Sequence, residues 1–203
     1  MKVALVGASG NIGTKVLGEL VSRGHTVTAI ARNPEKISKG AKVIAKKGDA
    51  SDVSAMAKLL EGHDLVISSL PFAPGLSNDI VAAVKRAGVK RYLMVGGAGS
   101  LEVAPGKMLK DTLQLPDAVK KIIEEGTASL DRLRGEHALD WTFFSPAAEI
   151  GPGERTGKFR LGGDQLVTDK AGKSRISYDD YAIALVDEVE HPKHVKKRFT
   201  IAY

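Results

Sequence analysis

Residues 2–13 read KVALVGASGNIG. The apolar run at residues 2–6 predicts a buried strand, and Ile12, Val16 and Leu20 recur at the spacing of a helix face. The glycines at positions 7, 10 and 13 therefore fill a turn between a strand and a helix. A glycine-rich turn in this position is typical of a loop that holds the diphosphate of a dinucleotide, because the first amides of the helix have no partner within it.

Each glycine of this turn has a separate expected role. Gly7 permits a sharp exit from the strand, Gly10 lets the backbone approach a diphosphate, and Gly13 lets the helix pack closely on the sheet. Ser9 and Asn11 can add side-chain donors. No lysine stands where an ATPase loop would place one, so ATPase chemistry is disfavoured. A tight turn without a ligand is the alternative interpretation.

Beyond this turn, apolar strands and amphipathic helices alternate along the whole chain. Further strands are expected at 26–31, 43–45, 64–70, 91–95, 141–144 and 199–202, with helices near 53–61, 76–87, 116–133 and 178–191. Such alternation predicts one α/β domain over residues 1–203, a doubly wound parallel sheet of Rossmann type. The stretches 97–115 and 147–175 fall outside the pattern and follow strand ends, where ligands of such sheets bind.

Composition excludes several classes of protein. The 203 residues contain no cysteine, which rules out disulfides, thiolate nucleophiles and cysteine-ligated metals, and no histidine pair suggests a metal site. The net charge is +6, yet no polybasic run with aromatic residues indicates nucleic-acid binding. No apolar run approaches the length of a membrane helix. We therefore expect a cytoplasmic protein that binds a small anionic cofactor.

Arg32 follows the second predicted strand, where an acidic residue would accept hydrogen bonds from an adenosine ribose. Its guanidinium cannot accept them but matches a 2′-phosphate, so NADP(H) is favoured over NAD(H). A solvated arginine is the alternative. Asp49 follows the third strand and either accepts from the adenine amino group or serves as a loop or helix-capping aspartate.

Several motifs together resemble a known family. They are GASGNIG at 7–13, Arg32, Gly48-Asp49, SSLP at 68–71, VGGAGS at 95–100, WTFFSP at 141–146 and ISYDDYA at 176–182. The chain resembles over its whole length the atypical short-chain dehydrogenases, in the NmrA-like branch that includes biliverdin reductase B-like proteins and NADH-flavin reductases. This resemblance implies a Rossmann fold that binds NAD(P)H and reduces a flavin, quinone or similar acceptor.

The same resemblance implies a set of cofactor contacts. Around the diphosphate it places Gly7, Ser9, Gly10, Asn11 and Ile12, and at the adenosine end Arg32. Beside adenine it places Asp49 and Ala50, beside the nicotinamide-side ribose Ser69 and Leu70, and near the nicotinamide Gly96, Gly97 and Pro146.

One departure from the family concerns proton donation. Short-chain dehydrogenases use Tyr-x-x-x-Lys to protonate a carbonyl oxygen, and none of the four tyrosines has a lysine four residues later. Ser100 can occupy the family's serine position, but it has no evident partner. A flavin or quinone needs no such acid because it spreads the new charge over a conjugated system. FMN or FAD as a substrate, held flat against the cofactor, is therefore favoured.

Other assignments rest on position alone. Phe72, Met108, Phe159 and Arg160 are candidate acceptor contacts, and the two irregular stretches form either a lid or solvated loops. The alternative function is a non-catalytic NADP(H)-binding redox sensor of NmrA type. A third candidate is an epimerase or dehydratase that acts on a bulky substrate, but the short region after the sixth strand leaves little room for the usual substrate domain. We expect a monomer or homodimer whose partner is a small-molecule redox acceptor.

Overall fold

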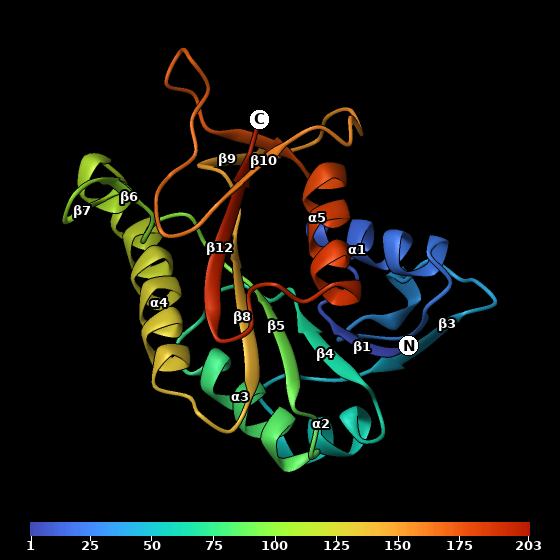
Figure 1. Cartoon of the computed structure of the whole chain (residues 1–203). Coiled ribbons are helices and arrows are strands. Elements are labelled where there is room, and N and C mark those ends of the chain that lie inside the picture. The colour runs from blue at the N-terminus through green and yellow to red at the C-terminus, as the bar shows by residue number, and fades with distance from the viewer.

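The computed structural model describes all 203 residues and contains one central sheet of eight strands (Figure 1). Its order is β10-β12-β8-β5-β4-β1-β2-β3. Seven strands are parallel: β1 (Lys2–Val6), β2 (Thr26–Ala31), β3 (Val43–Lys47), β4 (Leu65–Ser68), β5 (Arg91–Val95), β8 (Asp140–Ser145) and β12 (Lys197–Ala202). At the edge, β10 (Arg160–Gly162) runs antiparallel to β12. The predicted Rossmann sheet is confirmed.

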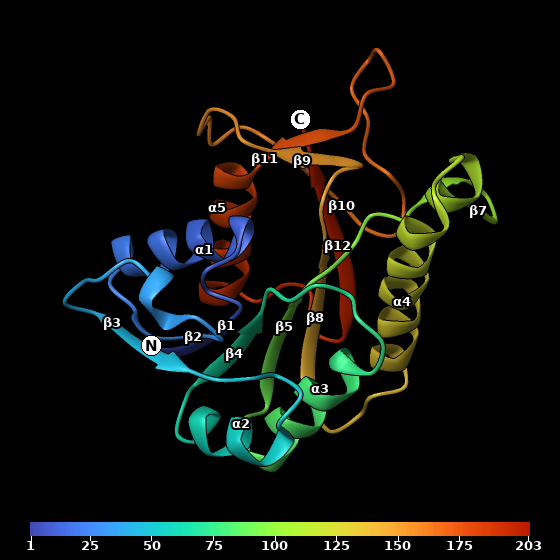
Figure 2. The same cartoon turned by 180° about the vertical axis from the view of Figure 1, so that it is seen from behind.

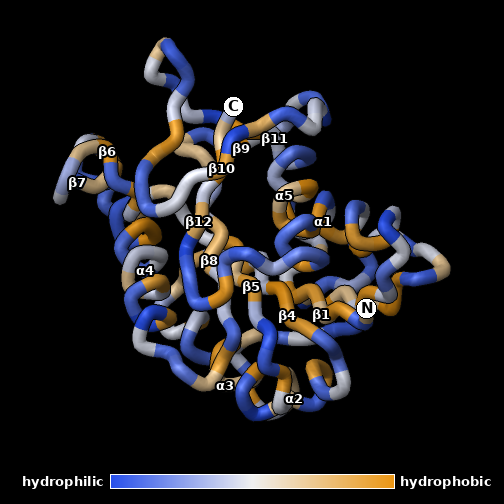
Figure 3. Tube along the Cα trace, viewed as in Figure 1, coloured by the Kyte–Doolittle hydropathy of each residue, from blue (hydrophilic) through white to orange (hydrophobic).

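Helices cover both faces of this sheet, as Figures 1 and 2 show from opposite sides. One face carries α1 (Asn11–Ser22) and α5 (Tyr178–Glu190), and the other carries α2 (Val53–Leu60), α3 (Leu76–Arg86) and α4 (Asp117–Arg134). Strand residues alternate between the two cores: Val3 and Leu5 pack toward α1 and α5, whereas Ala4 and Val6 pack toward the other three helices. In Figure 3 the hydrophobic colour follows β1 and β4 accordingly.

Side chains cap the starts of two helices. Asp52 caps α2 by accepting from the Ala55 amide at 2.9 Å, and Ser177 caps α5 by accepting from the Asp180 amide at 3.0 Å. Pro116 is the N-cap of α4 rather than its first residue. None of the helices combines the length and apolar character that a membrane crossing requires.

The two irregular stretches contain short elements that the sequence did not predict. Residues 97–115 form a hairpin of β6 (Glu102–Ala104) and β7 (Lys107–Met108), followed by a 3-10 turn at Leu109–Thr112. In the second stretch, β9 (Glu149–Gly151) pairs in parallel with β11 (Arg175–Ser177). Strands of two or three residues are too short to show a hydrophobic period, which explains why they were missed.

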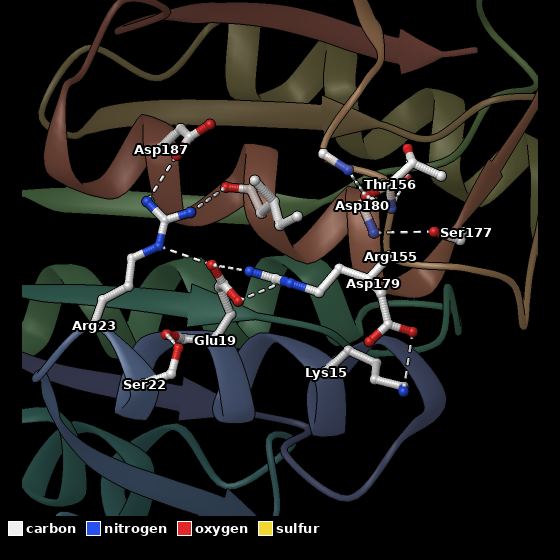
Figure 4. A network of polar contacts seen from close by, with 12 residues as sticks. Lys15, Glu19, Ser22, Arg23, Arg155, Thr156, Ser177, Asp179, Asp180 and Asp187 are labelled. Atoms are coloured by element: carbon white, nitrogen blue, oxygen red, sulfur yellow. Dashed lines mark hydrogen bonds and ion pairs between the residues drawn. The ribbon is translucent and has the colours of Figure 1, made fainter.

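Residues 154–158, which we call the strap, are tied to α1 and α5 by buried charges (Figure 4). Arg155 pairs with Glu19 of α1 at 2.8 Å, and the same carboxylate pairs with Arg23. Asp180 of α5, which is fully buried, accepts from the Thr156 hydroxyl at 2.6 Å, the Gly157 amide at 2.8 Å and the Tyr203 hydroxyl at 2.9 Å. Burial alone would raise the pKa of Asp180, but these hydrogen bonds outweigh it and hold the pKa below its usual range.

Replacing Asp180 with Asn should lower the free energy of unfolding by about 2–3 kcal/mol, because amide hydrogens would face the Thr156 and Gly157 donors. Since the folded pKa is lowered, this stabilisation is complete above the unfolded-state pKa of about 3.9 and declines as the pH falls toward the folded value. Urea denaturation at several pH values measures both effects.

The matched control is Asp179→Asn, which removes only a partly exposed ion pair with Lys15 and should cost less than about 1 kcal/mol. Equal losses for the two variants would contradict the assigned role of Asp180.

Candidate functional site

The carboxyl ends of β1, β2, β3 and β4 surround a groove of about 530 Å³. All of its lining residues lie between Val6 and Asp79 in the chain. Eight of the expected cofactor contacts line it: Gly7, Ser9, Gly10, Arg32, Asp49, Ala50, Ser69 and Leu70. Its volume lies within the range of small-molecule and cofactor sites, roughly 300–1,000 Å³.

The turn between β1 and α1 leaves no room for a side chain at two of its three glycines. Gly7 has a φ of +85°, and a Cβ on it would lie 2.0 Å from the carbonyl oxygen of Ser69. A Cβ on Gly13 would lie 2.1 Å from the carbonyl oxygen of Gly7. Both glycines are therefore required by the fold itself, at the point where β1, α1 and β4 meet.

Gly10 differs from its two neighbours because space around it is open. A Cβ there would meet only the Gly7 oxygen, at 3.5 Å, so the protein's own packing does not require glycine at this position. Gly10 is also the N-cap of α1, without a side-chain capping bond, and the amides of Asn11, Ile12 and Gly13 donate to no acceptor in the protein. Open donors beside an open glycine fit an anion held against the backbone.

Asn11 and Ile12 do not line the groove. Only their unpaired backbone amides, which directly follow Gly10, are available to an anion at the start of α1. The Asn11 side chain points toward the Tyr178 hydroxyl, with 3.5 Å between nitrogen and oxygen. Ile12 packs against the core beneath α1 and α5.

Arg32 follows β2 and Asp49 lies just after β3, so both line the groove on the side away from β4. Arg32 is exposed and its guanidinium forms no hydrogen bond or ion pair within the protein. One oxygen of Asp49 accepts from the Ser51 amide at 3.1 Å and from its hydroxyl at 2.8 Å. These two bonds, with a smaller effect from Arg32, lower the pKa of Asp49. Asp49 thus forms a local turn, and Asp52 rather than Asp49 caps α2.

Gly96, Gly97 and Pro146 follow β5 and β8 and do not line the groove. A Cβ on Gly96 would lie 2.2 Å from the Phe143 ring, so packing alone requires glycine there. The Pro146 carbonyl accepts from the Thr200 hydroxyl at 3.3 Å. A position near the nicotinamide stays a prediction for these three residues.

The sequence indicates no catalytic partner for Ser100, and a catalytic role for this residue stays a prediction. Ser100 is buried, and its hydroxyl accepts from Arg198 at 3.3 Å, away from the groove. The sequence could not indicate this contact because 98 positions separate the two residues.

The four candidate acceptor contacts do not converge on a common cavity. Phe72 stacks on Phe143 at 6.5 Å between ring centres, and Phe159 packs against the core near α1 and α5. Arg160 donates to the carbonyls of Thr168 and Tyr203, while Met108 lies in the β6–β7 hairpin. Packing and backbone contacts account for most of these side chains.

Sequence reasoning missed one wall of the groove. The connection from β4 to α3 lines it with Pro71, Ala73, Pro74, Leu76 and Asp79. Pro71 and Pro74 in the loop after β4 could have indicated this wall, because ligands bind at loops on the carboxyl edge of a parallel sheet.

The chain matches one family model and several solved structures over most or all of its length. A family model described as NAD(P)H-binding matches residues 7–192. A provisionally named exported protein from Burkholderia pseudomallei is 45% identical with a TM-score of 0.90, and the match covers 100% of both chains. A provisionally named epimerase from Bacteroides thetaiotaomicron is 44% identical with a TM-score of 0.95, covering 100% of this chain and 96% of that one. A provisionally named NADH-flavin reductase from Streptococcus pneumoniae is 37% identical with a TM-score of 0.83, covering 100% and 99%.

The crowding at Gly13 can be measured against another glycine of the same helix. Gly13→Ala should lower the free energy of unfolding by about 2–3 kcal/mol, because its methyl group would overlap the Gly7 carbonyl. Gly18 has open space around it, so Gly18→Ala should raise that energy by about 0.5–1 kcal/mol. Chemical denaturation of both variants tests the assignment. A Gly13→Ala protein as stable as wild type would refute the close contact.

Proposed function

The chain belongs to the NAD(P)H-binding family, and we propose that within it this protein is a reductase that uses NADPH to reduce a flavin, a quinone or a similar conjugated acceptor. The observation that carries the proposal is the groove itself. It reaches the start of α1 at Gly10, beside three unpaired amides, and it is also lined by Arg32, which is exposed and unpaired.

Residues in and beside the groove suit the separate chemical groups of NADPH. The amides at Asn11, Ile12 and Gly13 would hold the diphosphate, with Gly10 allowing close approach. Arg32 would pair with the 2′-phosphate, which a guanidinium binds through two parallel hydrogen bonds. Asp49 would border adenine, and Ser69 the second ribose. NADPH bound in this way supplies a hydride to the acceptor.

The tyrosines support an acceptor that needs no protein acid. Burial raises the pKa of Tyr92 and of Tyr181, whose hydroxyls bond Ser68 and the Phe144 carbonyl respectively. Tyr203 donates to Asp180. Only Tyr178 remains, beside Asn11 and without a lysine four residues later. The chain's contribution to catalysis is therefore to bind, orient and shield the two reactants.

The names of two relatives point to different reactions. The Streptococcus relative is called an NADH-flavin reductase and the Bacteroides relative an epimerase, so the names given to relatives cover more than one reaction.

We extend the proposal to a small-molecule acceptor as partner, a monomer or homodimer, and a cytoplasmic location. Cell fractionation tests the location, since the Burkholderia relative is called exported.

Arg32→Glu should weaken NADPH binding by about 10- to 100-fold and change NADH binding far less, because only NADPH carries the 2′-phosphate. Titration of both nucleotides by calorimetry measures this difference. Lys36→Glu is the control: it makes the same charge change at a nearby exposed position outside the groove. Equal losses of NADPH and NADH affinity in Arg32→Glu would refute the NADPH preference.

Purified protein with NADPH should reduce FMN, riboflavin or simple quinones well above background, measured by loss of absorbance at 340 nm. Gly10→Val should fold but lose this activity, since its side chain would occupy the open space against the groove. Tyr178→Phe should retain it, because the acceptor takes its proton from solvent.

Nucleotide binding without any turnover would instead favour a redox sensor. Loss of turnover in Tyr178→Phe, with nucleotide affinity unchanged, would show that the protein does supply an acid and would overturn this part of the proposal.

A further inference from the structure

A second cavity, of about 520 Å³, lies beside β12 and the C-terminal end of α4. It shares no lining residue with the nucleotide groove. In the sheet, β12 lies toward one edge and β1, β2 and β3 lie toward the other, and Figure 1 shows α4 beside β12 and away from β1 and β3. The two cavities are therefore separate sites of similar size.

The lining of this cavity is strongly basic. Four basic side chains, Arg134, Lys196, Lys197 and Arg198, line the cavity with a single carboxylate, Asp164. Apolar lining is limited to Trp141 and Leu161. A cavity with this balance disfavours a hydrophobic ligand and attracts an anion, because its cations are only partly neutralised.

The one carboxylate is shared between both arginines. Oδ1 of Asp164 accepts from Arg134 at 3.1 Å and from Nε of Arg198 at 2.7 Å. Arg134 also pairs with Asp131 at 3.1 Å, outside the cavity lining. Asp131 and Asp164 together offset the two guanidinium charges, so the excess positive charge of the cavity comes from Lys196 and Lys197.

Arg198 is unusual because its charged side chain is only 3% exposed. Besides the Asp164 carboxylate, its partners are the hydroxyl and carbonyl of Ser100, at 3.3 and 3.4 Å, and the backbone carbonyl of Asp164 at 3.3 Å. Burial lowers the pKa of Arg198, Asp164 opposes that effect, and Arg134 adds to the lowering. Each guanidinium nitrogen of Arg198 already has a partner in the protein, so this side chain supplies a fixed positive charge in the wall of the cavity.

The two lysines extend the positive charge to the rim. The Lys196 ammonium donates to the His137 carbonyl at 3.0 Å, which leaves its charge unbalanced. The Lys197 ammonium is exposed and has no hydrogen-bond or ion-pair partner. A free lysine beside a fixed arginine is a combination that suits phosphate oxygens, since both are phosphate-binding side chains.

From these observations we propose that this cavity binds a phosphate group, either free phosphate or the phosphate of a small metabolite. The buried Arg198 and Arg134 form its inner wall, and Lys197 contributes from the rim. The site is independent of the nicotinamide cofactor and of the reaction proposed above.

The fluorescence of a single tryptophan can report binding at this site. Trp141 is its one tryptophan, lines the cavity and is 3% exposed. Titration with inorganic phosphate, at an ionic strength held constant with potassium chloride, should change tryptophan fluorescence in a saturable way. Lys197→Gln should weaken the apparent affinity about tenfold, as the loss of one charge-assisted contact predicts.

The matched control is Lys58→Gln on α2, which removes an exposed, unpaired lysine far from the cavity and should leave the titration unchanged. Thermal unfolding confirms that both variants fold. Phosphate bound in the nucleotide groove would be insensitive to Lys197→Gln, so the variant separates the two sites. Ribose 5-phosphate in place of phosphate distinguishes the sources: tighter binding indicates a phosphate ester, and weaker binding indicates the free ion.

A fluorescence change that chloride reproduces, or one that does not saturate, would overturn the proposal. So would a titration of Lys197→Gln identical to that of wild type.

Discussion

The structure depends on one crowded point at which three chain segments meet without room for a methyl group. The carbonyl of Gly7 lies against Gly13, and the carbonyl of Ser69 lies against Gly7. Close contact between the end of β1, the start of α1 and the end of β4 fixes where α1 begins. Because α1 begins there, its first amides are left unpaired and face the end of the sheet. The geometry of the groove is thus a consequence of backbone packing before any side chain is considered.

Most of the fold could be predicted from the sequence because its elements are local and strongly periodic. The alternation of Val3 and Leu5 with Ala4 and Val6 reports two buried faces, and the glycines and caps mark where helices end and begin. The edge strand β10 escaped prediction since three residues carry no period. Asp180 and Arg198 escaped for another reason: their partners are distant in sequence, and a buried charge is recognisable only when those partners are known.

The candidate site was predictable to a similar degree. Residues that follow β1 to β4 line the groove as their positions suggested, because parallel strands bring their carboxyl ends to one edge. Ser100 shows the limit of this reasoning. Its place after β5 suggested chemistry, whereas the fold directs its hydroxyl to Arg198, in the wall of the second cavity. The motif shows that Ser100 follows β5 in the chain. Its contact with Arg198 depends on where β12 packs, which the motif does not show.

Every residue that lines the groove at the ends of β1 to β4 comes from the first 79 positions. The strap, the β6–β7 hairpin and the second cavity all come from later positions. After a gene duplication, substitutions beyond residue 79 would leave every lining residue of the groove unchanged. Relatives named for different chemistries are then an expected outcome of descent, and the two portions of such a gene should accumulate substitutions at different rates.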